Sequence, residues 1–162
     1  MKTAVLLERP SAPQAAPGQR SNCNDDSLGR AAANLERSAH TYSRQPSRLS
    51  LWGLTAAAVD AAQALQAHAR ECESDHGVLA GLAASQPGMV ANIERAWGDH
   101  PLAISQANDL VIAATGVQAR DSTDPTVLLQ RALVCARLIE AHRRRTNTLV
   151  FDWAFRDFGG EG

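Results

Sequence analysis

Carboxylate and histidine side chains at helical spacing are the residues of this 162-residue chain that most readily suggest chemistry. Glu36 and His40 are four residues apart, so they share one face of a helix. Glu73 and His76 have the Glu-x-x-His spacing that carboxylate-bridged di-metal bundles use. Such bundles also require glutamates that project inward from facing helices, and the remaining glutamates do not complete a regular set. The sequence therefore predicts no metal ion and no cofactor.

A further histidine stands in an apolar stripe. His68 lies between Leu65 and Cys72 at steps of three and four residues. A single histidine in such a stripe is more often an interior residue that hydrogen-bonds its neighbours than a metal ligand. The three cysteines, Cys23, Cys72 and Cys135, are odd in number and lack a C-x-x-C spacing, which argues against a disulfide framework or a zinc knuckle. We therefore expect buried or idle thiols.

Arg137 and His142 form an Arg-x4-His motif near the end of a long helical pattern. This motif resembles that of HEPN-type ribonucleases, which are all-helical and carry the pair on a late helix. The resemblance implies that His142 transfers a proton at a ribose 2′-hydroxyl while Arg137 stabilises phosphate charge. Three arginines follow His142 and would attract RNA. The alternative is that both residues flank a core helix, with the arginines complementing the negative end of its dipole.

Helices must position these side chains. Leu28 to Tyr42 and Leu51 to Cys72 carry apolar residues every three or four positions, and the short connection between them predicts an antiparallel hairpin. Two short helical pieces are expected at 78–84 and 89–97. A further helix is expected to start at Asp99 and Pro101 and to end near Gly116, and another to start at Asp124 and Pro125. The predicted fold is an all-α bundle of about five or six helices.

The two ends of the chain differ in composition from this bundle. Residues 1–26 contain three prolines among small and polar residues, and we expect a disordered leader. Residues 27–158 should form a single helical domain, followed by a flexible end at 159–162. Thr146 to Thr148 are expected to interrupt the last long helix. An aromatic segment then follows, which contains Phe151, Trp153, Phe155 and Phe158. We predict a helix here, with a short strand as the alternative, and this segment either caps the bundle or binds a partner.

The charge and the apolar patterns limit the classes of function. The formal charge of −1 gives no general attraction to nucleic acid or anionic lipid. No apolar run reaches the length of a membrane-spanning helix, so a cytoplasmic location without membrane contact is expected. The sequence favours a non-catalytic interaction or adaptor module, which binds a protein partner or a second copy through an Ala-rich helix stripe or the aromatic segment. The alternative is the metal-independent ribonuclease, the only case in which nucleic acid would be a partner.

Overall fold

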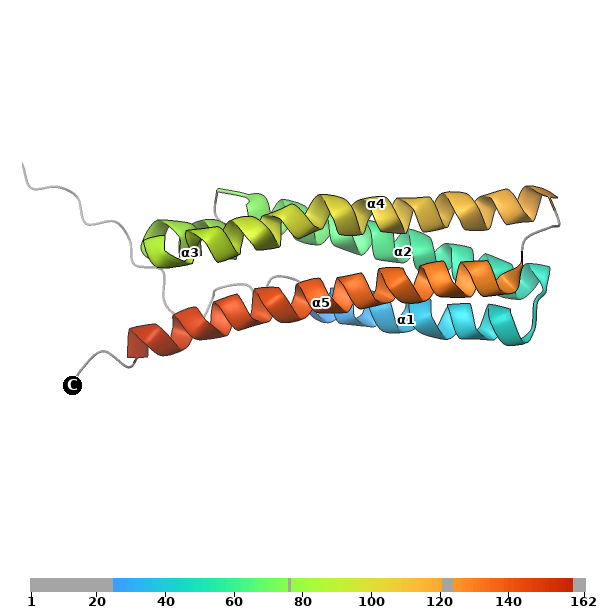
Figure 1. The fold of residues 1–162 in the computed structure, drawn as a ribbon, viewed down its shortest axis with the longest axis horizontal. Helices are drawn as coiled ribbons and strands as arrows, with labels where there is room; N and C mark the ends of the chain where they lie inside the picture. Colours follow the sequence, from blue (N-terminus) through green and yellow to red (C-terminus); the bar gives the residue numbers. More distant parts are fainter. Residues whose placement is uncertain (1–24, 76, 121–123, 159–162) are drawn as a thin grey trace, which may run out of the picture.

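Four long helices make up an elongated bundle (Figure 1). The computed structural model describes residues 25–75, 77–120 and 124–158, and all regular structure within these ranges is helical. Neighbouring long helices run in opposite directions along the bundle (Figure 1). A short helix and a 3-10 turn connect the second long helix to the third. The elements are α1 (Asp25–Arg44), α2 (Arg48–Glu73), α3 (Val78–Ser85), η1 (Pro87–Met89), α4 (Val90–Arg120) and α5 (Pro125–Phe158).

The all-α prediction is confirmed, but the bundle has four long helices instead of five or six. The predicted start at Asp99 and Pro101 lies inside α4, which continues to Arg120. Pro101 is exposed, and it lacks the N–H group that would otherwise donate to the carbonyl group of Trp97. Apolar residues before and after the proline are buried on one continuous face of α4, and this burial outweighs the lost hydrogen bond.

The predicted interruption at Thr146 to Thr148 is also absent. α5 runs without a break from Pro125 to Phe158, so the aromatic segment is helical as predicted but belongs to α5. The Thr148 hydroxyl donates to the backbone carbonyl of Arg144 at 3.0 Å, which satisfies the hydroxyl inside the helix. Thr146 is buried on the face of α5 that packs against the bundle. Threonines of this kind are accommodated within a helix once tertiary packing favours it.

The predicted hairpin between α1 and α2 is confirmed. Ser47 and Ser50 form a capping box at the start of α2, in which each side chain bonds the other residue's backbone N–H. The predicted apolar stripe of α2 is buried along its whole length, from Leu51 to Cys72. α1 begins at Asp25, two residues before the predicted boundary, while the rest of the predicted leader and the predicted end at 159–162 lie outside the described residues.

Two separate apolar cores hold the bundle together. The larger one, the proximal core, lies between α1 and the adjoining parts of α2, α4 and α5. The smaller one, the distal core, lies at the opposite end, where α3 and η1 pack on α2, α4 and α5 (Figure 1). None of the helices in the described ranges combines the length and the apolar character that crossing a membrane requires. The buried residues of the distal core are Cys72, Leu79, Leu82, Met89, Ile93, Ala96 and Leu149.

Candidate metal centre

Four metal-binding side chains from three helices meet between the two cores. α2 supplies His68 and Cys72, α4 supplies His100 and α5 supplies His142. The exposed fractions of His68, Cys72, His100 and His142 are 0%, 0%, 1% and 2%, so almost none of their surface contacts solvent. We call these four residues the histidine layer. Its members occupy positions in the apolar stripes of their helices, at one height along the bundle.

The ligand atoms of the layer converge on a small volume. Nε2 of His142 lies 3.0 Å from Nε2 of His68 and 3.1 Å from Nε2 of His100. Sγ of Cys72 lies 3.4 Å from Nε2 of His68. One ligand atom each from His68, Cys72 and His100 can be chosen so that all three lie within 4.8 Å of one another. In a tetrahedral zinc shell neighbouring nitrogens are about 3.3 Å apart and nitrogen and sulfur about 3.6 Å apart, from the usual Zn–N and Zn–S bond lengths.

Hydrogen bonding among the histidines cannot account for all of these contacts. A neutral imidazole has one N–H group and one lone pair. If Nε2 of His142 carries the hydrogen, it can donate to His100 or to His68 but has no lone pair left to accept from the other. If it carries none, its single lone pair faces two neighbours. A cation among the three nitrogens would be bound by all three lone pairs at once.

Glu73 orients His100 from outside the layer. Its Oε1 lies 2.6 Å from Nδ1 of His100, and about half of the Glu73 side chain is exposed while His100 is buried. An ionised carboxylate can only accept, so Nδ1 of His100 is the donor and Nε2 of a neutral His100 keeps its lone pair toward the layer. This carboxylate–histidine arrangement is the usual outer shell of a histidine metal ligand.

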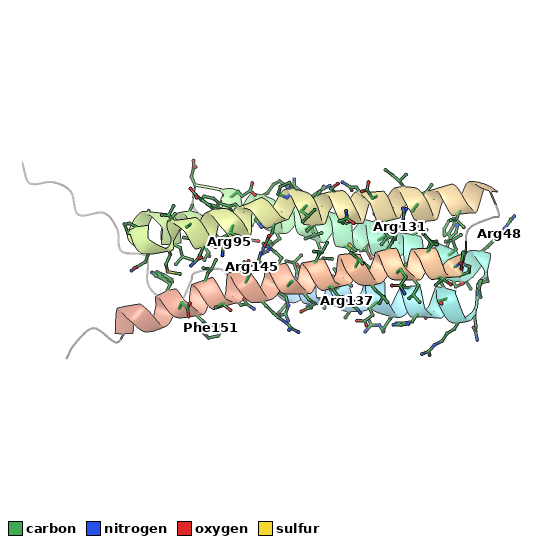
Figure 2. All side chains as sticks on the ribbon, in the orientation of Figure 1. Arg48, Arg95, Arg131, Arg137, Arg145 and Phe151 are labelled. Atoms are coloured by element: carbon green, nitrogen blue, oxygen red, sulfur yellow. The ribbon has the colours of Figure 1, made fainter. Side chains whose placement is uncertain are left out.

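Asp99 lies beside His142 as Glu73 lies beside His100, but the contact is longer. Its Oδ2 lies 3.7 Å from Nδ1 of His142, which is longer than a hydrogen bond. The same carboxylate forms an ion pair with Arg145 of α5, which Figure 2 labels between α4 and α5. Burial, together with the nearby His100, lowers the pKa of His142 to about 4, so this imidazole is neutral at pH 7. A neutral imidazole is the form that binds metal.

A route from solvent reaches the edge of the layer. A groove of about 600 Å³ lies on the α2 and α4 side of the bundle, where both Glu73 and His100 line it. The remaining lining residues are mainly apolar. An ion that enters here would meet the half-exposed carboxylate of Glu73 before the buried imidazole of His100. The groove is lined by Ala69, Glu73, Trp97, His100, Pro101 and Ile104.

The structure does not bring the predicted ribonuclease pair together. Arg137 is exposed, whereas His142 points into the bundle and is buried. Five residues of α-helix separate two side chains by roughly 140° around the axis, which explains the divergence. Among the following arginines, Arg143 pairs with Glu140 and Arg145 with Asp99.

The other predicted sites are distributed over the surface. Glu36 and His40 lie 4.0 Å apart on the exposed face of α1. His76 is outside the described residues, so the Glu73–His76 spacing has no structural description. In the aromatic segment Phe151 is 61% exposed and lies on the outer side of α5 (Figure 2), and Trp153 packs against the distal core. The side chains of Phe155 and Phe158 lie outside the described residues.

Sequence reasoning identified parts of the layer but not the layer itself. The sequence patterns predict an interior position for His68 and pair His142 with Arg137, but they miss His100. A usable signal does exist, because each histidine continues the apolar stripe of its helix. His100 lies between Ala96 and Ala103 at steps of four and three residues. Three such histidines on three different helices are the pattern to look for.

Comparisons with known proteins add no assignment to this geometry. The chain matches no family model, no curated protein and no solved structure.

Proposed function

We propose that this protein is a metal-binding helical bundle that holds one transition metal ion in the histidine layer. The observation that carries the proposal is the grouping of His68, Cys72 and His100, whose ligand atoms lie within 4.8 Å of one another. Nε2 of His142 adds a fourth donor, 3.0 Å from Nε2 of His68 and 3.1 Å from Nε2 of His100. The tight contact of Glu73 with His100 supports it from the outer shell. The sequence predicted no metal, because the ligands come from separate helices.

Zinc is the ion that this set of ligands suits best. Three imidazoles and one thiolate match the nitrogen and sulfur ligands of tetrahedral zinc sites. Harder ions such as Mg²⁺ and Ca²⁺ prefer six or more oxygen ligands, and the layer offers none from its four members. The thiolate of Cys72 would offset one of the two charges of Zn²⁺, and the carboxylates of Glu73 and Asp99 would offset the rest.

The arrangement favours tight retention of the ion over metal-assisted hydrolysis. Four protein ligands complete a tetrahedral shell, whereas catalytic zinc sites keep one position for water or substrate. Each ligand is at least 98% buried, so substrate has no direct access to the ion. We therefore expect a structural or regulatory ion.

Metal titration tests the proposal directly. The purified chain is stripped with chelator and titrated with Zn²⁺ against a competing indicator, and we expect one ion per chain with a Kd below about 1 µM. Titration with Co²⁺ should produce the visible absorption of tetrahedral cobalt together with a thiolate-to-cobalt charge-transfer band. This band reports the bond to sulfur and so identifies the thiolate ligand.

Two buried cysteines provide a matched control. Cys72 and Cys135 are both buried. Cys72→Ser should abolish the charge-transfer band and weaken binding, while Cys135→Ser should change neither. The proposal is wrong if the stripped wild-type chain takes up no ion, or if the two serine variants behave alike.

The interaction module inferred from the sequence is a separate proposal. The Ala-rich stripe of α2 is buried within the bundle, so we restrict this proposal to the C-terminal part of α5. Phe151 supports it as a large exposed apolar side chain.

A further inference from the structure

The histidine layer divides the bundle into halves of unequal strength. Among the described residues the proximal core contains twenty-three buried members and the distal core seven. In the proximal core, the long helix α1 packs against α2 and α5. In the distal core, the described elements that take the place of α1 are the eight-residue α3 and η1. Because local stability follows buried apolar contact, the distal half is expected to open more readily.

α1 begins at the height of the layer. Gly29 lies in the second turn of α1, and a Cβ placed on it would be 3.6 Å from the side chain of Arg143. Arg143 follows the layer residue His142 in the sequence. Figure 1 shows α1 beside the part of α5 nearest the α4–α5 connection, with α3 at the other end. Beyond the layer the long helices α2, α4 and α5 therefore continue without α1.

Cys72 connects the layer to the distal core. It is a member of both, since its Sγ lies beside His68 and its side chain belongs to the distal cluster. The turn into α3 rests directly on it, because a Cβ on Gly77 would lie 2.5 Å from the backbone oxygens of Glu71 and Cys72. Only glycine permits such a close approach of the two backbone segments. A bond from an ion to Cys72 would therefore hold the base of α3 in place.

We propose that metal binding in the histidine layer closes the distal half of the bundle, so that the protein is a metal-dependent conformational switch. The inference rests on the proposed function. Without an ion, the layer is a buried polar break in which Nδ1 of His142 has no hydrogen-bond partner, and the distal half opens locally. With an ion, α2, α4 and α5 are joined immediately beneath the distal core.

Thermodynamic linkage makes the coupling reciprocal. If the ion stabilises the closed distal half, then any change that loosens the distal half must weaken binding of the ion by the same factor. A change in the proximal core should lower overall stability without this specific effect. The two cores each offer a completely buried leucine for the comparison, Leu82 in α3 and Leu54 in α2.

Hydrogen exchange of the wild-type chain tests the first half of this argument. Amide exchange is measured with and without saturating Zn²⁺. The distal segments, α3 and the start of α4, are compared with the proximal segments, α1 and the part of α2 that packs on it. We expect the ion to slow exchange at least about tenfold in the distal segments and much less in the proximal ones. Equal slowing in both halves, or no slowing once Zn²⁺ is bound, would overturn the inference.

Two leucine variants test the reciprocal half. We expect Leu82→Ala to weaken Zn²⁺ binding about tenfold while the proximal helices stay folded by circular dichroism. Leu54→Ala should lower the melting temperature and leave the Zn²⁺ affinity close to that of the wild type. Equal weakening in both variants would contradict the inference. If the wild-type chain binds no Zn²⁺ at all, it is the proposed function that fails.

Discussion

Leu65 and His68 lie one turn apart on α2 and both are completely buried, but the proximal core and the histidine layer around them have opposite chemistry. The proximal core is a cluster of buried hydrophobic residues, so burial itself stabilises the fold. In the layer the same burial removes imidazoles from water, which disfavours folding unless hydrogen bonds or an ion replace the lost hydration. A stripe position determines that a side chain is buried, and the residue type determines whether burial is favourable.

The largest effect, on Zn²⁺ affinity, should come from replacing a histidine of the layer with an apolar residue like those of the proximal core. We expect His68→Leu to lower Zn²⁺ affinity on the order of 1,000-fold, because a ligand is lost from a four-coordinate shell. The metal-free variant should melt at the same temperature as the metal-free wild type or higher, since an apolar side chain suits this buried position. Titration and calorimetry measure the two quantities. A variant that binds Zn²⁺ normally would remove His68 from the site.

A substitution in the proximal core should lower the stability of the metal-free protein, in contrast to His68→Leu. Leu54→Ala should lower the free energy of unfolding by about 3 to 4 kcal/mol, from lost apolar burial and the remaining cavity. Chemical denaturation of the metal-free protein measures this loss. A loss below about 1 kcal/mol would mean that the proximal core is packed more loosely than the structure indicates.

Acid should destabilise the metal-free protein through the layer. The pKa of His142 in the folded state is about 4, below its ordinary value of 6.5. Between pH 4 and 6.5 the unfolded chain therefore binds more protons than the folded chain. The stability that neutral His142 contributes is complete above pH 6.5 and is lost as the pH falls toward 4. We expect a loss of roughly 3 kcal/mol over this range, measured by denaturation in chelator. His68, His100 and Asp99 face the same imidazole, so His142→Gln is the control and should flatten the dependence.

The two outer carboxylates should differ in importance. Glu73→Gln should weaken Zn²⁺ binding about 10- to 100-fold, because Glu73 directly orients His100. Asp99→Asn should have a smaller effect, since Asp99 is 3.7 Å from His142 and is also paired with Arg145. Zn²⁺ titration of both variants measures the difference. The reverse order would show that the Asp99 contact shortens when the ion binds.

The smallest effect should come from the outer side of α5. Phe151→Ala should change the free energy of unfolding by less than about 0.5 kcal/mol, because the side chain is 61% exposed. Its Zn²⁺ affinity should equal that of the wild type. If this variant loses self-association or partner binding in light scattering or pull-down measurements, the interaction proposal gains support. A large loss of stability would place Phe151 in the core instead.

Sequence reasoning predicted the helices best where a stripe was regular. The stripe of α2 and the buried positions from Ala103 to Val117 on α4 are both confirmed. It was wrong at Pro101 and at Thr146 to Thr148, where local propensity favoured a break. Packing on both sides of these residues favours one continuous helix, and helix propensity, which is a local preference, does not account for that packing.

The sequence by itself determined that the described part of the chain is helical and that His68 falls on a buried stripe. Only the tertiary structure decided that His68, His100 and His142 meet at one height and that Cys72 joins them. Periodicity specifies the face of a helix, but the relative height of two helices depends on the lengths of the connections and on packing between α2, α4 and α5. The chemistry of the site is therefore a property of the assembled bundle.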